Sequence, residues 1–348
     1  MTVDASVRIP AEAAAPGFVE LHGGGSSVVL IPALGGKIRD ITLAGRQWLW
    51  HHPDVPFVVP ADAAAFRGPD DCGGFDDCLP TLSECLLPTW VQGVRTRHLP
   101  DHGELWSQQP SFDVAAEEGG PSATCRWTGA AMPYEFRRTV SVRLDGSVMF
   151  TYLLANAGTH RMPFLWAAYP VLPLTEQTRI VLPGGARTRI GTQHGIAIGR
   201  PGSEHRWPRL RVGSNLVDLS HPASAQRENY ACKLFVDLGR ADAVIALEEH
   251  GVRLEMRLDG GVRPCAGLWI DRGGGPTQSA DGPSRWNVLA PRNRRARSTI
   301  VLGPCLGAPD NLSEALGAWD DAHWIEPGAT AKWTMTWRGT LAEPLDGA

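Results

Sequence analysis

Residues 252–258, which read VRLEMRL, indicate the fold class of this chain. Apolar and charged residues alternate along the stretch, and a period of two is typical of a β-strand with one buried face. Residues 332–337, KWTMTW, alternate in the same way and are rich in the aromatic and β-branched types that favour strands. Both stretches are therefore predicted to be half-buried strands.

Short apolar runs of the same kind continue on both sides of these stretches. The chain contains 39 Gly and 28 Pro residues, which are typical of turns between strands. The segment LDGS at 144–147 predicts a hairpin turn, and helical signal is confined to 309–319, where Asp310 is expected to cap a short helix. Many strands with almost no helix predict an all-β sandwich or barrel. Further predicted strands cover residues 18–21, 27–31, 37–43, 139–144, 148–154, 233–238, 243–247, 266–270 and 299–302.

The domain organisation follows from the continuity of this pattern. No internal repeat of fixed period and no convincing linker interrupt the chain of 348 residues. We therefore predict a flexible N-terminal arm over residues 1–15, one large β domain over 16–342, and a short tail over 343–348.

Composition and charge exclude several classes of protein. The chain has 33 basic and 37 acidic residues, so no basic excess favours nucleic acid as a partner. No apolar stretch approaches the roughly 20 residues of a membrane span, and the N-terminus does not resemble a signal peptide. Lys37, Lys233 and Lys332 are the only lysines, which we interpret as a compositional bias.

The seven cysteines favour reduced thiols and a cytoplasmic location. An odd number of cysteines without an export signal is typical of a reducing compartment. Cys72, Cys78 and Cys85 lie close together in sequence, and with Asp71 or His98 they have a donor set for zinc. Because the chain contains no Cys-x-x-Cys pair, we favour buried thiols and predict no metal.

The densest polar segments lie between residues 70 and 106. Residues 70–77 read DDCGGFDD and residues 101–104 read DHGE. Glycines beside acidic residues allow tight turns that direct carboxylates into one space. A carboxylate beside His102 can orient the imidazole and raise its basicity. The alternative interpretation of 101–104 is a polar turn between strands.

The thirteen tryptophans form a second group of candidates. Most are expected to pack in the core. Trp106, Trp166 and Trp269 lie beside polar residues at expected strand ends, where an indole face can stack on a sugar ring.

The order of several segments resembles the aldose 1-epimerase (galactose mutarotase) superfamily. The resemblance spans about residues 18–338, and it implies a single large β-supersandwich that acts on a sugar without a cofactor. No single motif is specific to the superfamily, whereas the order of the motifs along the chain is more specific. The segments are LIPALGGKI at 30–38, GGFDDCLPT at 73–81, LPDHGELW at 99–106, FLWAAYP at 164–170, VLGPC at 301–305 and IEPG at 325–328.

The resemblance also implies a reaction and roles for residues. In the family, a carboxylate base takes the proton of the anomeric hydroxyl while a histidine acid protonates the ring oxygen, so the pyranose opens and recloses. His102 matches the family histidine that positions the sugar. Tyr169 stands at the place of the histidine acid, and Gly303 stands at the place of the glutamate base.

These departures predict weak or absent mutarotation. Each proton-transfer group contributes about 10²–10⁴ in rate, so the loss of both costs several powers of ten. On this hypothesis Gly303→Glu combined with Tyr169→His gains activity. A relocated base is the alternative, and its candidates are the carboxylates Asp76, Asp77, Asp101, Glu104 and Asp271.

Four functions therefore stay open. The first is a pyranose-binding protein that serves as a sensor or accessory module in carbohydrate metabolism, and the second is an active isomerase with a relocated base. The third acts on a hexose phosphate held by Arg67, since arginine suits bidentate phosphate contacts, although Arg67 can equally pair with a nearby aspartate. The fourth is a structural or interaction sandwich without a sugar site. The first three predict a cleft around His102 and a small-molecule sugar as the partner.

Overall fold

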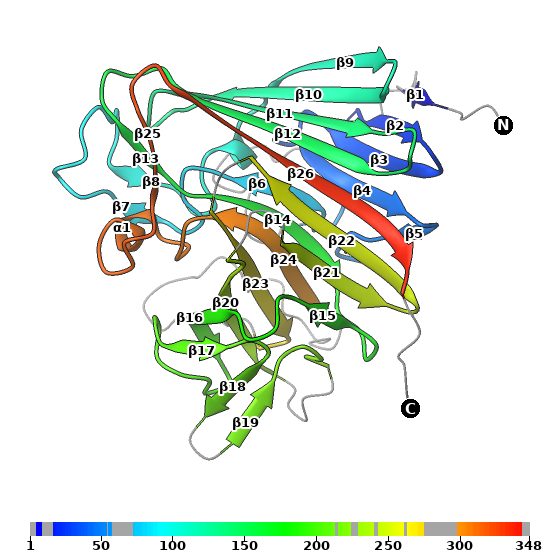
Figure 1. The fold of residues 1–348 in the computed structure, drawn as a ribbon. Coiled ribbons are helices and arrows are strands. Elements are labelled where there is room, and N and C mark those ends of the chain that lie inside the picture. Colours follow the sequence, from blue (N-terminus) through cyan, green and yellow to red (C-terminus); the bar gives the residue numbers. More distant parts are fainter. Residues whose placement is uncertain are drawn as a thin grey trace.

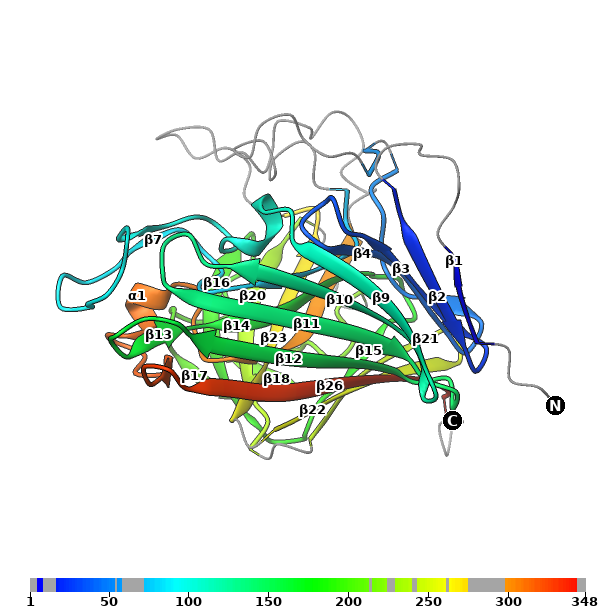
Figure 2. The same cartoon turned by 90° about the horizontal axis from the view of Figure 1, so that it is seen from above.

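The computed structural model describes residues 5–8, 17–53, 55–57, 72–212, 215–223, 229–239, 243–260, 263–274 and 298–342. Two large antiparallel sheets dominate this part of the chain, and Figures 1 and 2 show them stacked face to face. The all-β fold class predicted from the alternating pattern is therefore confirmed.

The first sheet has 14 strands, and it carries most of the residues that the sequence singled out. In spatial order its strands are β1 (Ser6–Arg8), β2 (Val19–Gly23), β3 (Ser26–Ile31), β4 (Lys37–Leu43), β6 (Phe75–Cys78), β14 (Trp166–Pro173), β24 (Ser298–Leu306), β23 (Pro264–Arg272), β20 (Ala231–Asp237), β16 (Arg187–His194), β17 (Glu204–Arg206), β18 (Arg209–Val212) and β19 (Asn215–Asp218), with β5 (Arg46–Gln47) paired to β4.

The second sheet has eight strands and covers one face of the first. Its order is β15 (Arg179–Val181), β21 (Val244–Glu249), β22 (Val252–Asp259), β26 (Thr330–Leu341), β12 (Val148–Asn156), β11 (Tyr134–Val142), β10 (Gly120–Thr128) and β9 (Ser111–Glu117). Two short pairs complete the strands, β13 (Met162–Phe164) with β25 (His323–Ile325) and β7 (Cys85–Leu86) with β8 (His98–Leu99).

The two stretches that indicated the fold class lie side by side in the second sheet. β22 pairs with β26 along its whole length, and its alternate residues Leu254, Met256 and Leu258 are buried. The hairpin predicted at 144–147 joins β11 to β12, where Val142 pairs with Val148.

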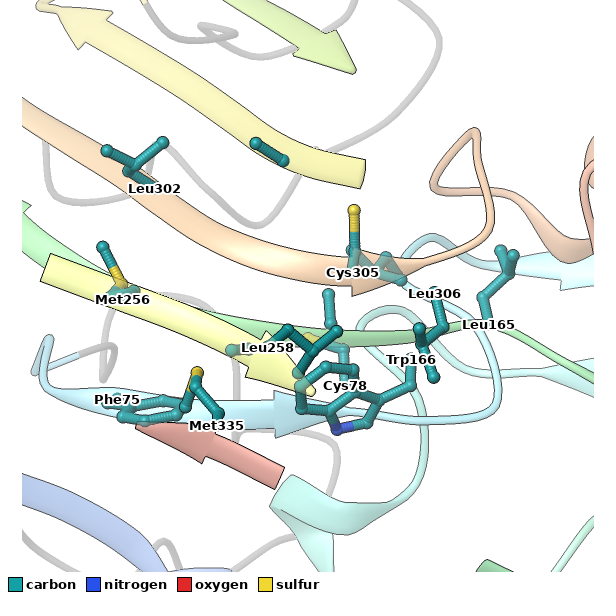
Figure 3. Close-up of a cluster of buried hydrophobic side chains, with 14 of the residues drawn as sticks. Phe75, Cys78, Leu165, Trp166, Met256, Leu258, Leu302, Cys305, Leu306 and Met335 are labelled. Carbon is teal, nitrogen blue, oxygen red and sulfur yellow. The ribbon is translucent and has the colours of Figure 1, made fainter. Parts of the chain in front are cut away.

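The core lies between the two sheets and is rich in aromatic rings. The ring of Phe75 on β6 stacks on that of Trp337 on β26 at 5.6 Å, and the ring of Trp166 on β14 lies 4.7 Å from that of Tyr152 on β12. Figure 3 shows Met335 and the neighbouring β22 side chains packed against β6, β14 and β24. Each such buried side chain contributes about 1.5–3 kcal/mol, so this layer holds the sheets together.

Two details differ from the expectations. The predicted helix is a single turn, α1 (Leu312–Ala315), and its N-cap is Asn311 rather than Asp310. The side chain of Asn311 accepts a hydrogen bond from the amide of Glu314. The N-terminal arm contains one short strand, because β1 pairs with β2. Local capping rules could not distinguish the adjacent Asp310 and Asn311, and a three-residue strand has too few residues to show a period. The predicted tail, 343–348, lies outside the described residues.

Among the described residues, no helix has the length and apolarity that crossing a membrane requires. Nor do three or more His, Cys, Asp or Glu side chains in this part of the chain come together as a metal site.

Candidate functional site

Strand alternation assigns the candidate residues of the 14-stranded sheet to its two faces. Phe75 contacts β26, and Asp77 forms an ion pair with Arg138 of β11, so both side chains point into the core. Asp76 therefore lies on the opposite face, which we call the outer face because it points away from the eight-stranded sheet.

One row of residues crosses the centre of the outer face. Tyr169 on β14 pairs with Asp76 on β6. The ladder between β14 and β24, in which Ala167 pairs with Cys305 and Val171 with Val301, sets Tyr169 opposite Gly303. Gly303 in turn pairs with Gly267 on β23. Directly opposed residues of antiparallel strands share a face, so Tyr169 and Gly303, the positions that the resemblance assigns to the acid and the base, are neighbours here.

His102 is held over this row by a tight turn between β8 and the 3₁₀ turn Leu105–Ser107. The amide of His102 donates to the carbonyl of Leu82 at 2.7 Å, and the amide of Glu104 donates to the carbonyl of Leu79 at 2.8 Å. His102 has φ of 58°, in the left-handed region that few non-glycine residues adopt. The turn is thus fixed to the segment that follows β6.

His102, Trp106 and Tyr169 form an aromatic cluster on the outer face. The imidazole centroid lies 5.0 Å from that of Tyr169 and 5.1 Å from that of Trp106. Nδ1 of His102 lies 2.9 Å from Oδ2 of Asp101. The carboxylate of Asp101 therefore contacts the imidazole from the side of Nδ1. The rings of His102 and Tyr169 thus lie on the same face of the sheet.

Lys37 borders the cluster on one side. Its ammonium forms an ion pair with Asp76, donates to the carbonyl of Gly73 at 2.9 Å, and lies 5.1 Å from the ring of Trp106. Only 5% of its side chain is exposed. Burial of a charge is tolerated when a partner and hydrogen bonds compensate for lost hydration.

Lys233 borders the cluster on the other side. Its Nζ lies 3.1 Å from Oδ1 of Asp310 and 5.9 Å from the ring centroid of Tyr169. It also lies 5.3 Å from the ring of Phe235, and 5% of its side chain is exposed. Two buried ammonium groups thus flank the aromatic cluster, each with its own carboxylate.

Trp269 and Asp271 lie on the same face but farther away. Trp269 pairs with Lys233 across β20 and β23, and its ring approaches that of His194 at 6.4 Å. Asp271 follows two residues later on β23. Both are half-buried and stand two strands from Tyr169 on the outer face.

Asp77 and Trp166 are not on the outer face, contrary to the expectation that they contact a sugar. Oδ2 of Asp77 lies 2.8 Å from Nη1 of Arg138, and Oδ1 accepts from the indole of Trp166 at 3.1 Å. Burial raises the pKa of the Asp77 carboxyl, although the ion pair with Arg138 opposes the rise. Trp166 has no exposed surface. Both side chains therefore stabilise the core.

Glu104 is also placed away from the candidate site. Its carboxylate accepts hydrogen bonds from the amides of Ala130 at 3.2 Å and Ala131 at 2.5 Å and from the hydroxyl of Tyr134 at 2.9 Å. Burial raises its pKa, while the amide of Ala131 and the Tyr134 hydroxyl lower it. Glu104 anchors its turn to the loop before β11, which rules it out as the relocated base in this conformation.

Gly303 leaves no room for the side chain that the family carries there. A β-carbon at this position would lie 2.3 Å from the carbonyl oxygen of Ala168 and 3.1 Å from Cδ of Pro170. A glutamate at Gly303 is therefore expected to clash with the neighbouring backbone, which argues against the prediction that Gly303→Glu restores a base.

Lys37 and Lys233 are the residues that sequence reasoning missed. The available signal was the scarcity of lysine, since two of the three lysines are buried on the outer face and Lys332 is exposed on β26. A compositional bias toward arginine does not explain why the remaining lysines are buried beside carboxylates. Arg67 lies outside the described residues.

The comparisons with known proteins identify the fold. No protein-family model matches the sequence, and no curated protein matches it. Among solved structures, a galactose mutarotase-like protein from Clostridium acetobutylicum is similar over 97% of this chain and 99% of its own, with 9% identity and a TM-score of 0.63.

Two further solved structures lead to the same conclusion. A provisionally assigned aldose 1-epimerase from Escherichia coli K12 covers 97% of this chain and 100% of its own at 15% identity and a TM-score of 0.59. A galactose mutarotase related enzyme from Lactobacillus acidophilus covers 95% and 100% at 13% identity and a TM-score of 0.56. The chain therefore has the galactose mutarotase-like β-sandwich fold, as the order of its motifs predicted.

Proposed function

We propose that this protein binds a pyranose on the outer face of its 14-stranded sheet and that its mutarotase activity is weak or absent. The observation that carries the proposal is the cluster of His102, Trp106 and Tyr169 beside the family's base position. The fold shared with proteins named as mutarotases and epimerases supports a sugar as the ligand class.

The cluster offers both kinds of contact that a sugar needs. The imidazole and phenol rings present apolar faces and polar edges at short range, whereas the indole of Trp106 is buried and donates its N–H to the carbonyl of Asp77 at 2.9 Å. The carboxylate of Asp101 lies against Nδ1 of His102. Sugar hydroxyls exchange hydrogen bonds with water for hydrogen bonds with protein, so the net affinity is expected to be about millimolar.

Lys233 is proposed as a further contact to the sugar. An ammonium has three donors, and the described part of the chain gives Lys233 one carboxylate partner, Asp310. Its position 5.9 Å from the ring centroid of Tyr169 supports a contact between its remaining donors and a sugar at the aromatic cluster. A hydrogen bond from a charged donor is worth about 1.5–3 kcal/mol, or roughly 10- to 100-fold in affinity.

Weak catalysis follows from the chemistry of the row. Gly303 has no proton acceptor, and the backbone of Ala168 fills the space into which a side chain would extend. Tyr169 is a poorer acid than histidine near pH 7 because a phenol ordinarily has a pKa of about 10. An opening of the hemiacetal needs both groups, so the loss of each reduces the rate.

Titration calorimetry with a panel of aldoses and hexose 6-phosphates tests binding. We expect millimolar binding of at least one sugar in the panel and the loss of this binding in His102→Ala. The affinity of Lys233→Met should be roughly 10- to 100-fold weaker, because the variant lacks one charged hydrogen bond. Lys332→Met is the matched control, because Lys332 is exposed on the other sheet. Equal heats for the native protein and His102→Ala would refute the site.

Polarimetry with glucose and galactose tests the catalytic half of the proposal. We expect rates near the uncatalysed background. Rapid mutarotation would instead favour an active epimerase with a relocated base. Asp76, Asp101 and Asp310 pair with Lys37, His102 and Lys233 at the cluster, and single replacements by Asn would identify which of them is the base.

A further inference from the structure

Two cysteines, Cys265 and Cys305, face each other across neighbouring strands. They are a directly opposed pair in the ladder between β23 and β24, and their Sγ atoms lie 2.9 Å apart. Both are free thiols in the structure. The pair stands one row from Gly303 and Gly267, on the same outer face of the sheet.

The backbone geometry already suits a disulfide. Directly opposed residues of antiparallel strands have Cα atoms about 4.5–5.5 Å apart, and disulfides span Cα separations of about 4.4–6.8 Å. The two sulfur atoms need to approach by about 0.9 Å to reach bonding distance, which small side-chain rotations provide.

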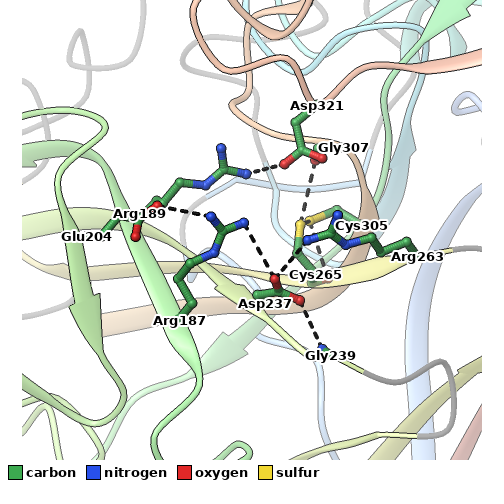
Figure 4. Close-up of polar contacts among 10 residues, drawn as sticks. All are labelled: Arg187, Arg189, Glu204, Asp237, Gly239, Arg263, Cys265, Cys305, Gly307 and Asp321. Atoms are coloured by element: carbon green, nitrogen blue, oxygen red, sulfur yellow. Dashed lines mark hydrogen bonds and ion pairs between the residues drawn. The ribbon is translucent and has the colours of Figure 1, made fainter.

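The pair is accessible from a pocket next to the sheet. Cys265 is half-buried and lines this pocket, whereas Cys305 lies behind it with 1% of its surface exposed. Figure 4 shows Cys265 among the ion-paired side chains, between the Arg189–Asp321 pair and Asp237. The charged lining consists of Arg187, Arg189, Asp237, Arg263 and Asp321.

We propose that Cys265 and Cys305 form a dithiol site that a peroxide oxidises to a cross-strand disulfide. The Cys265 thiolate attacks one peroxide oxygen, the O–O bond breaks, and Cys265 becomes a sulfenic acid as hydroxide leaves and takes up a proton. The Cys305 sulfur then attacks Sγ of Cys265, and the S–S bond forms as the sulfenic oxygen leaves as water. Two thiols lose two electrons and two protons, and one peroxide is reduced to two waters.

Oxidation of this pair is slow compared with that of an activated thiol. The hydrogen bond between the thiols and burial raise the pKa of Cys265, and the carboxylate of Asp321 adds to the rise while Arg189 opposes it. Because the thiolate is the nucleophile, its low population limits the first step. Once the sulfenic acid forms, the second sulfur is already in contact, which favours the disulfide over further oxidation.

Mass spectrometry of the full-length protein after reduction and peroxide treatment tests the proposal. We expect the loss of two hydrogens from the intact mass, a cross-linked peptide containing Cys265 and Cys305, and full reversal by dithiothreitol. Cys265→Ser should abolish the loss. Cys232→Ser should retain it, because Cys232 is buried on another strand and its pKa is raised to about 12 by burial.

A second measurement uses the reduced protein and does not depend on oxidation. Phenylarsine oxide bridges two adjacent thiols, so one equivalent should bind the native protein and Cys232→Ser but not Cys265→Ser. Retention of arsenical binding or of the mass loss in Cys265→Ser would overturn the assignment. Oxidation of Cys265 to sulfinic acid without a cross-link to Cys305 would overturn it as well.

Discussion

Replacement of Gly303 by alanine tests whether close backbone approach, rather than chance, explains the glycine at the family's base position. The added β-carbon would lie 2.3 Å from the carbonyl oxygen of Ala168. A normal contact between carbon and oxygen is about 3.3 Å or more. β14 and β24 would therefore have to separate locally by about 1 Å, in the middle of the sheet.

The expected loss is at least about 3 kcal/mol, the upper end of the range for overpacking, because a strand backbone cannot rotate out of the way as a side chain can. Gly267 provides a matched control, since it is the direct partner of Gly303 on β23. Its added β-carbon would lie 3.4 Å from Sγ of Cys305 and 3.8 Å from Nζ of Lys233, which are ordinary contacts. Gly267→Ala is expected to stay within about 1 kcal/mol of the native protein.

Urea unfolding followed by tryptophan fluorescence measures both variants. The native protein and Gly267→Ala should unfold at nearly the same midpoint urea concentration. Gly303→Ala should have a much lower midpoint, with a similar dependence of the unfolding free energy on urea concentration. If the two alanine variants differed by less than about 0.5 kcal/mol, the steric explanation would be wrong. The family base could then be restored at this position after all.

Two further predictions concern residues outside the proposed site. Glu104→Gln should lower the free energy of unfolding by about 1–3 kcal/mol, because it weakens three buried hydrogen bonds, while sugar affinity measured by calorimetry stays unchanged; a selective loss of affinity would return Glu104 to the site. Burial lowers the pKa of His323 below its ordinary value of about 6.5, so its contribution to stability is present above that value and is lost as the pH falls through the folded-state pKa. His323→Gln should flatten the decline in unfolding free energy between about pH 7.5 and pH 5, and an equal decline in both proteins would contradict this.

The sequence predicted the fold better than the site because the two rest on different information. The alternation at 252–258 and the turn at 144–147 are local, and both are present as predicted. The environment of Lys233 depends on Asp310, which is distant in sequence and meets it only through the sheet order. Nothing local to either residue indicates that pair.

The misplaced candidates show which part of the site could still have been predicted. Trp166 and Tyr169 lie three residues apart on one strand, and residues separated by an odd number in a regular strand point to opposite faces. The same argument separates Asp76 from Asp77. Once Tyr169 is placed on the outer face, alternation alone assigns Trp166 to the core.

The remaining difficulty was that both faces of these central strands are covered. All four residues of β6 are buried, so the segment shows no alternation between polar and apolar residues from which its faces could be read. From the sequence alone, Asp76 and Asp77 are therefore equally good candidates for a site. In the structure, Asp77 pairs with Arg138 in the core and Asp76 pairs with Lys37 on the outer face. The cations distinguish the two aspartates, and the two buried lysines, in a chain that has only one other lysine, lie on the face where we propose that the sugar binds.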